Sequence, residues 1–282
     1  MEYTELLDHI KEHIECHHLS DFIGTSPKYH KHETYELYLF LRGDVNYYIE
    51  EKGYHLIRGS LLFIPPETLH RVEWLDPKVY ERCYLNFSTT FMEHHNSKRT
   101  NLLASFYGEP SAPVFLLTEQ EIQEFIILLH QLKKELLSEE YGSDLKSTAL
   151  LCQLLININP LQKQKSYLPK DIMPPIVRKT MDYIDSHLSE PLSLSILEKN
   201  IHNNGTYISR CMKNITGLTL QEYIIYKRIK LAEEYLIKGY SLNETCLLCG
   251  FNDYSNFSKA FKKQLNFSPK KYQLQLIKGK VF

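Results

Sequence analysis

Four side chains near the amino-terminal end are of types that can bind a metal ion. His30, His32 and Glu36 lie within the stretch HKHETYE, and His70 follows further along the chain. Imidazole nitrogens and a carboxylate oxygen are suitable ligands for iron, nickel, manganese or zinc. The same groups can instead bind an organic ligand, or they can be surface histidines at the rim of a barrel. Residue types alone leave these three interpretations open.

Two further groups of potential metal ligands have simpler explanations. Residues 1–20 predict an amphipathic helix in which His9, His13 and His17 recur at every fourth position. This spacing can chelate a metal, but we interpret it as a solvated or pH-sensitive helix face. Cys246 and Cys249 form a CxxC pair, and the sequence has no second pair at zinc-finger spacing. We therefore expect two buried thiols there.

A pattern of aromatic and basic residues occurs twice in the carboxyl-terminal third. The segment TYISRCMKNITGLTLQEY (206–223) aligns with SNFSKAFKKQLNFSPKKY (255–272). In each segment, apolar residues at helical spacing form one stripe and basic residues lie on the opposite side. A short amphipathic segment, opened by the capping residue Ser193 or Ser241, precedes each copy. Each copy therefore predicts a helix, a tight turn and a second helix, the unit that places its second helix in the major groove of DNA.

The segment between the two copies and the charge distribution support DNA binding. Residues 220–236 predict a connecting helix about 25 Å long, at about 1.5 Å per residue. A rod of that length can hold two reading helices near one turn of DNA, about 34 Å apart. Residues 173–282 carry 16 Lys and Arg against 9 Asp and Glu, a net charge of +7, whereas residues 1–172 carry 17 against 25, a net charge of −8. A basic carboxyl-terminal third is typical of a module that binds phosphates.

Residues 35–88 predict the strands that must position the histidines. The segments YELYLFLRG, VNYYIE, GYHLI, SLLFIPP, HRVEW and YERCYLNFS are separated by turn residues such as Gly43-Asp44 and Asp76-Pro77. We expect short strands that form a sandwich or a small barrel. Two amphipathic helices follow at about residues 118–158. Residues 159–175, rich in proline and lysine, are expected to form a linker.

The expected fold is therefore α+β with two domains. The first domain, residues 1–158, has a cupin-like β-barrel at about residues 20–117 and a helical segment at about residues 118–158. The second domain, residues 176–282, is all-α and has two helix-turn-helix units joined by a linker helix.

The carboxyl-terminal third resembles the DNA-binding domain of AraC-type (AraC/XylS) bacterial transcription regulators. The stretch GFNDYSNFSKAFKKQLNFSPKKY matches the family's signature nearly position for position, and the resemblance covers about residues 173–275. It implies that two sets of side chains read DNA bases: Thr206, Ser209 and Arg210 in the first unit, and Ser255, Asn256 and Lys259 in the second. Arginine and lysine can bond guanine, and asparagine suits adenine. The expected phosphate contacts are Lys213, Lys262 and Lys263.

The first helix-turn-helix unit departs from this family pattern. Glu198 stands where a small alanine usually allows two helices to cross closely. His202 replaces the usual glycine of the turn, and Asn203 replaces an apolar residue. Because burying an unpaired carboxylate is costly, we expect this unit to pack more loosely or to dock differently from the second.

The strand region resembles both motifs of cupin barrels. The matching positions are His30, His32, Glu36, Gly43, Gly59, Pro65 and His70, whereas Glu67 and Trp74 depart from the usual glycine and asparagine. In metal-binding cupins these positions hold an ion, whereas in AraC-type domains they often line the barrel without one. We prefer a pocket for a sugar or similar metabolite, and we expect no metal and no cofactor. The expected lining residues are His30, His32, Glu36, Tyr38, Tyr48 and His70.

The resemblance also implies a dimer. In AraC-type regulators the helices after the barrel form a dimer seam, and an amino-terminal arm folds over the ligand. We expect both helices to cover the open side of the barrel and, in addition, a homodimer through one apolar stripe of the first helix, made of Ile122, Phe125, Ile126, Leu129, Leu132 and Leu136.

These features together predict a sequence-specific transcription regulator rather than an enzyme. It would bind double-stranded promoter DNA and respond to a small-molecule effector, with RNA polymerase as a further candidate partner. Scattered cysteines, with no signal peptide and no long apolar run, predict a cytoplasmic protein without a membrane segment. Two alternatives are a cupin metalloenzyme with an appended basic domain, and a constitutive DNA-binding protein whose barrel only dimerises.

Overall fold

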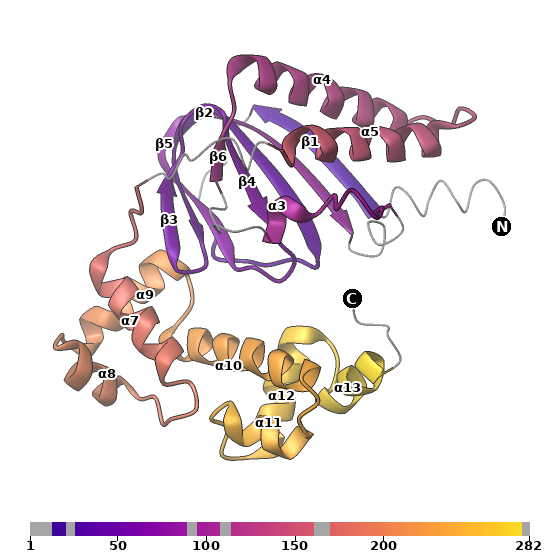
Figure 1. Ribbon diagram of the computed structural model, residues 1–282. Helices are drawn as coiled ribbons and strands as arrows, with labels where there is room; N and C mark the ends of the chain where they lie inside the picture. Colours follow the sequence, from indigo (N-terminus) through magenta and orange to yellow (C-terminus); the bar gives the residue numbers. More distant parts are fainter. Residues whose placement is uncertain (1–12, 21–25, 89–94, 108–113, 161–169, 278–282) are drawn as a thin grey trace. The chain divides into compact units, whose positions relative to one another are not determined.

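The chain forms two compact units, Met1–Ile172 and Met173–Phe282. The computed structural model describes residues 13–20, 26–88, 95–107, 114–160 and 170–277 (Figure 1). The first unit is an antiparallel sheet covered by helices and the second is helical, so the predicted α+β class is confirmed. Among the described helices, none is both long and apolar enough to cross a membrane.

The sheet of the first unit is built around two long strands. Its strands are β1 (Ile14–Ser20), β2 (Thr34–Ile49), β3 (Lys52–His55), β4 (Ser60–Ile64), β5 (His70–Ser88) and β6 (Val114–Leu116). Their order is β1-β5-β2-β4-β6, with β3 beside β2. Strands β2 and β5 pair from Thr34↔Ser88 to Ile49↔His70. The segments expected as separate short strands on either side of Gly43-Asp44, and of Asp76-Pro77, are thus parts of one strand each.

A bulge in the middle of β2 reverses the alternation of its side chains. The register with β5 shifts between Phe40 and Val45. Gly43 lies inside this bulge with φ +136°, and a Cβ there would stand 2.7 Å from the carbonyl oxygen of Val79. Only glycine fits such a position without strain. Even-numbered residues therefore face the sheet interior before the bulge, and odd-numbered residues face it afterwards.

The two faces of the sheet have separate cores. The interior core is aromatic and contains Tyr38, Phe40, Tyr47, Tyr54 and Tyr80. The outer face is covered by α3 (Ala104–Tyr107), α4 (Glu119–Leu136) and α5 (Ser143–Ile158) (Figure 1). Six side chains were expected at a dimer seam. Five of them are buried in this outer core: Ile122, Phe125, Leu129, Leu132 and Leu136. The sixth, Ile126, is partly buried against it. Their stripe thus packs within the same chain.

The expected amino-terminal helix is wrong for residues 14–20. Ile14–Ser20 form β1, which pairs with β5 from Ile14↔Phe87 to Ser20↔Glu81. Ile14 and Cys16 are buried in the outer core. His13 and His17 therefore do not share a helix face, and His9 and the expected arm lie outside the described residues.

The second unit consists of short helices with well-formed ends. They are α7 (Pro175–Ser186), α8 (Leu194–Ile201), α9 (Gly205–Thr216), α10 (Leu220–Ile237), α11 (Leu242–Leu248), α12 (Tyr254–Leu265) and α13 (Pro269–Ile277). Ser193 and Ser241 cap α8 and α11 as expected, and Asp253 caps α12. Thr219 and Glu222 form a capping box at the start of α10. The pairs α8–α9 and α11–α12 are the two predicted helix-turn-helix units, joined by α10.

Candidate DNA-binding surface and ligand site

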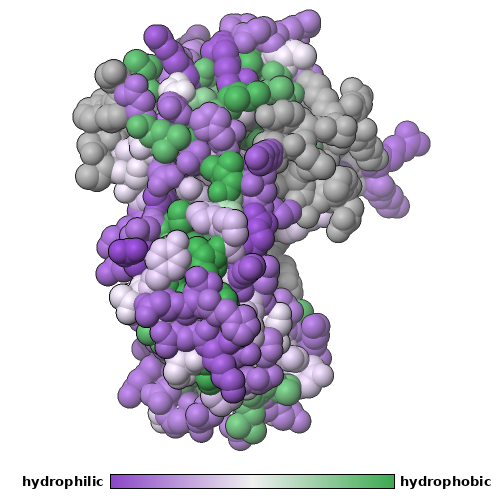
Figure 2. All heavy atoms as spheres, turned by 90° about the vertical axis from the view of Figure 1, so that its left-hand side faces the viewer, coloured by the Kyte–Doolittle hydropathy of each residue, from purple (hydrophilic) through white to green (hydrophobic). Residues whose placement is uncertain are grey.

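Helices α9 and α12 each bury one face and expose the other. Ile208 and Met212 are buried on α9, and Phe257 and Phe261 are buried on α12, all with 0% exposure. The opposite faces carry the side chains expected to contact DNA. Thr206, Arg210, Lys213, Ser255, Asn256, Lys259, Lys262 and Lys263 are exposed, and Ser209 is half-buried. Hydrophilic side chains cover most of the visible face of the second unit, in the lower half of Figure 2.

The first helix-turn-helix unit compensates for its unusual glutamate. Glu198 is exposed, and its carboxylate accepts a hydrogen bond of 2.5 Å from the backbone N–H of Gly205. Gly205 is buried, and a Cβ there would stand 2.6 Å from Cγ of Leu194 and 2.9 Å from the Glu198 side chain. The small residue at this crossing is thus on α9 instead of α8, and the carboxylate stabilises the start of α9. The unit is therefore not loosely packed at this crossing, and a different docking on DNA stays a prediction.

The turn of the first unit also differs from that of the second. His202 ends α8 in the left-handed region at φ +58°, where the second unit has Gly250 at φ +75°. A non-glycine residue in this region is uncommon, and histidine is among the types that tolerate it. Asn203 is exposed, and the next residue, Asn204, caps α9 by accepting from the N–H of Tyr207.

Arg228, in the middle of α10, links the segment before α8 to the turn of the second helix-turn-helix unit. Its guanidinium donates to the carbonyl oxygens of Leu188 (3.0 Å) and Glu190 (2.7 Å), which precede α8. It also lies 5.7 Å from the ring centroid of Phe251, in the turn of the second unit. A Cβ at Gly250 would stand 2.3 Å from the Leu188 carbonyl oxygen. Sequence reasoning missed this role because partners distant in the chain give no local pattern.

The CxxC cysteines are core residues. Cys246 is 4% exposed and Cys249 is 0% exposed, and both pack in the apolar core around α10. Burial raises the pKa of Cys246, and it raises the pKa of Cys249 to about 12. Both thiols are therefore protonated near neutral pH, as the buried-thiol interpretation requires.

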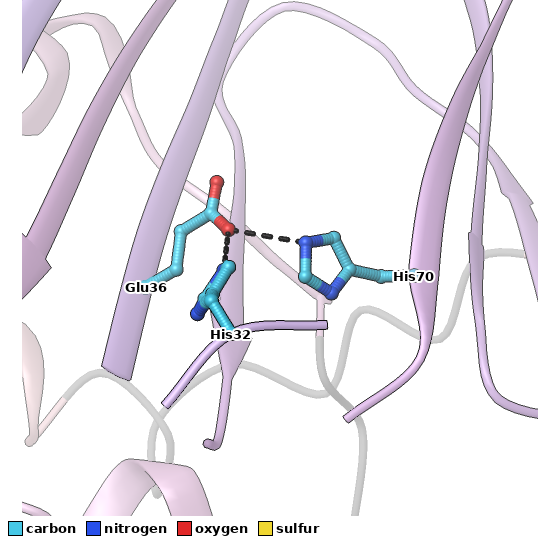
Figure 3. A group of neighbouring side chains, drawn as sticks. All are labelled: His32, Glu36 and His70. Atoms are coloured by element: carbon cyan, nitrogen blue, oxygen red, sulfur yellow. Dashed lines mark hydrogen bonds and ion pairs between the residues drawn. The ribbon is translucent and has the colours of Figure 1, made fainter. Parts of the chain in front are cut away.

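In the first unit, His32, Glu36 and His70 come together in the sheet interior. Figure 3 shows their side chains converging from the segment before β2, from β2 and from the start of β5. Nε2 of His32 lies 2.8 Å from Oε2 of Glu36, and Nε2 of His70 lies 3.3 Å from the same oxygen. Glu36 is 8% exposed and His70 is 1% exposed. His30 is joined to His70 by a β-bridge, and its ring lies 4.4 Å from the His70 ring, yet it is exposed.

This cluster holds its carboxylate ionised although it is buried. Burial alone would raise the pKa of Glu36, but contacts with His32 and His70 outweigh it and lower this pKa to about 2. Burial likewise opposes charging of His32, but the hydrogen bond with Glu36, the negative charges of Glu36 and Glu67 and the hydrogen bond to the Thr34 backbone together outweigh burial and raise the pKa of His32. Burial and the neighbouring His70 lower the pKa of His30. The interior thus presents one anionic carboxylate between imidazoles.

The bulge in β2 changes which tyrosines accompany this cluster. Tyr38 faces the interior, where its hydroxyl contacts that of Tyr80. Tyr47 faces the interior too, and its ring centroid lies 4.9 Å from that of Tyr38 and 6.2 Å from that of His70. Tyr48 lies on the opposite face, where its hydroxyl donates to Glu73. This placement corrects the sequence-based grouping of Tyr48 with Tyr38, because strict alternation does not continue through a bulge.

Asn86 is a further polar residue that sequence reasoning missed. It stands directly opposite Glu36 in the β2–β5 register. Its side-chain oxygen is buried and has no hydrogen-bond partner among the described residues, and the same is true of Nε2 of His70. Buried polar atoms in folded proteins are nearly always satisfied, so these two atoms are exceptions within the sheet interior.

A two-domain protein that pairs a polar cluster inside a sheet with two helix-turn-helix units is a DNA-binding regulator with a sensor domain. The family model described as "AraC-like ligand binding domain" matches residues 13–155, and the model described as "Helix-turn-helix domain" matches residues 199–275. The chain belongs to the AraC family of DNA-binding transcription regulators.

Similar proteins agree with this class. The HTH-type transcriptional activator RhaR of Cronobacter sakazakii is 24% identical over 259 residues, which span 87% of this chain and 86% of that protein. The probable transcriptional regulator LumQ of Photobacterium leiognathi is 30% identical over 93 residues, 33% of this chain and 38% of that protein. These relatives are transcription regulators, so the metalloenzyme alternative is set aside.

Two solved structures of transcription regulators were also matched to this chain. ToxT from Vibrio cholerae matches with 15% identity and a TM-score of 0.37, over 93% of this chain and 94% of that chain. The carboxyl-terminal domain of AraT, a response regulator from Geobacillus stearothermophilus, matches with 28% identity and a TM-score of 0.36, over 37% of this chain and 88% of that chain.

Proposed function

We propose that this regulator binds a small, hydroxyl-bearing metabolite, such as a sugar, inside the sheet of its first unit. The observation that supports this most strongly is the pair of unsatisfied buried atoms, Nε2 of His70 and Oδ1 of Asn86, beside the ionised Glu36. Tyr38 and Tyr47 add aromatic walls. A few polar groups among aromatic side chains are typical of a pocket for such a ligand.

We further propose that α9 and α12 read promoter DNA in two successive stretches of the major groove. Arg210 and Lys259 are exposed at matching places on the two helices, and each can bond the edge of a guanine. Thr206, Ser209, Ser255 and Asn256 complete the proposed base contacts, and Lys213, Lys262 and Lys263 the proposed phosphate contacts. The linker helix α10 joins both units, and its Arg228 contacts the segment before α8 and the turn of the second unit.

The route from effector to DNA-binding unit is proposed to run through β3. The N–H of Gly53 in β3 donates to the Asp171 side chain (3.0 Å), and its carbonyl oxygen accepts from the N–H of Ile172 (2.9 Å). This end of the linker precedes Met173, where the second unit begins. Because β3 pairs with β2, which carries Glu36, a ligand that favours one arrangement of β2 and β3 shifts the linker as well.

We also propose that the protein acts as a homodimer, through side chains other than the buried stripe of α4. The exposed apolar residues on or beside α4 and α5 are Ile127, Leu137, Tyr141, Leu145 and Ile156. Exposed apolar side chains grouped on neighbouring helices favour association. RNA polymerase remains a candidate partner of the DNA-bound dimer.

The experiment that tests this function has two stages. Genomic fragments selected by the purified protein define its operator, and the genes beside the operator suggest a panel of metabolites. Fluorescence anisotropy on the operator should then show a change in affinity with one metabolite, and Glu36→Gln should abolish that change while operator binding persists. Equal operator binding across the whole panel would support the constitutive alternative instead.

A further inference from the structure

Tyr207 lies on the outward face of α9 beside Arg210, the side chain proposed above to bond a guanine. The buried residues of α9 are Gly205, Ile208, Met212 and Thr216. At about 100° per residue along a helix, Tyr207 and Arg210 fall on either side of the direction that points away from this buried stripe. Tyr207 is 43% exposed, so a large aromatic ring faces solvent on the surface proposed to enter the major groove.

The second helix-turn-helix unit has a proposed base contact at the matching place. The 49-residue repeat aligns Tyr207 with Asn256 and Arg210 with Lys259. Asn256 and Lys259 are both exposed on α12, and both are proposed to read bases. Because the two units are copies, the same two places on each reading helix face DNA. Tyr207 therefore stands where the other copy carries an amide suited to adenine.

Two contacts hold the Tyr207 side chain on this face. The guanidinium carbon of Arg210 lies 5.6 Å from the centre of the Tyr207 ring, which is within range of a cation–π contact. The hydroxyl shares a hydrogen bond with the Cys211 side chain one turn further along, and this bond raises the pKa of Tyr207. Since the hydroxyl has a partner within the helix, the apolar ring is the part left to meet a base.

An apolar ring in the major groove distinguishes bases by one group, the C5-methyl of thymine. Residues three apart are neighbours on a helix surface, and successive bases on one strand are about 3.4 Å apart. Side chains that touch each other on α9 therefore meet adjacent bases. We propose that Tyr207 is a further base-reading residue, whose ring contacts the C5-methyl group of a thymine next to the guanine bonded by Arg210. This role rests on the proposed reading of DNA by α9 and specifies a two-base step for it.

The test compares operator duplexes that differ by one methyl group. They carry thymine or deoxyuridine beside the guanine whose preference Arg210→Ala relaxes, and fluorescence anisotropy gives the affinity of the full-length protein. Loss of the methyl group should weaken binding of the unaltered protein by about 3- to 5-fold, the effect of one buried carbon. Tyr207→Ala should bind both duplexes equally. Tyr207→Phe should keep the difference, because it keeps the ring.

Tyr240→Ala is the matched control, since Tyr240 is 40% exposed and lies outside α9 and α12. It should prefer the thymine duplex as the unaltered protein does. The comparison of thymine with deoxyuridine in the unaltered protein needs no variant, so it decides even if Tyr207→Ala does not fold.

Three results would overturn the proposal. They are an operator without thymine beside that guanine, equal binding of the unaltered protein to both duplexes, and a folded Tyr207→Ala variant that still prefers thymine. Arg210→Ala separates these failures from failure of the proposed function. If it relaxes the guanine preference, α9 reads DNA without Tyr207. If it leaves every preference unchanged, the reading role of α9 is wrong as well.

Discussion

The proposed operator has two DNA segments, one read by α9 and one read by α12. Replacing Arg228 with methionine should weaken binding to DNA that carries both segments far more than binding to DNA that carries only one. The guanidinium donates to the carbonyl oxygens of Leu188 and Glu190 and packs beside Phe251. Methionine keeps most of the apolar stem and removes every donor. The segment before α8 and the turn of the second helix-turn-helix unit then lose the side chain that contacts both of them.

The size of the effect follows from these contacts. A hydrogen bond to a charged group contributes about 1.5–3 kcal/mol when buried. Arg228 is only half-buried, and burial lowers its pKa, so we take about 2 kcal/mol for both bonds together. At about 1.4 kcal/mol per factor of ten, loss of this fixed geometry weakens two-segment binding by about 10- to 30-fold. A single segment contacts one unit only, and its binding should change by less than about 3-fold.

Fluorescence anisotropy with duplexes that carry either both segments or one gives these affinities, and urea unfolding reports the stability of the second unit. Lys238→Met is the control, because Lys238 is an exposed cation at the end of the same helix. An equal loss on both duplexes, or an equal loss in the Lys238 variant, would refute the reasoning about Arg228.

Three further predictions concern the second unit. Lys263→Ala should weaken binding to all DNA sequences alike. It should also reduce, by about one, the magnitude of the slope of log affinity against log salt concentration. An altered base preference would show instead that Lys263 reads bases. Gly205→Ala places a Cβ 2.6 Å from Leu194 and 2.9 Å from Glu198, and should lower the free energy of unfolding by about 1–2 kcal/mol after the gain in helix propensity. A more stable variant in urea would contradict that packing. Cys249, with a pKa raised to about 12 by burial, should resist iodoacetamide at pH 8 in the native protein, and rapid alkylation would show that it is accessible.

The helix-turn-helix units were predictable because their information is local. Apolar spacing specified which faces of α9 and α12 are buried, and the cap residues Ser193 and Ser241 specified where α8 and α11 begin. The 49-residue repeat then made the two units recognisable as copies. Their link through Arg228 was not predictable, since it joins residues that lie 38 and 40 positions apart.

The sheet was less predictable because long-range pairing decides its details. Gly43 does carry the positive φ that its type suggested, but it lies in a bulge within β2 instead of ending a strand. That bulge brings Tyr47, and not Tyr48, to the cluster of Glu36 and His70. Residues 14–20 have a helical pattern and nevertheless pair with β5, where Cys16 is buried against α4.

The most direct test of the central claim is a map of base preference across the selected operator, measured for the unaltered protein and for Arg210→Ala and Lys259→Ala. We predict two preferred segments about 10 base pairs apart on one side of the duplex. Each variant should lose about 1–3 kcal/mol of discrimination at its own segment only. If both variants relax the same segment, or if neither changes the preference, α9 and α12 do not read DNA in the way proposed.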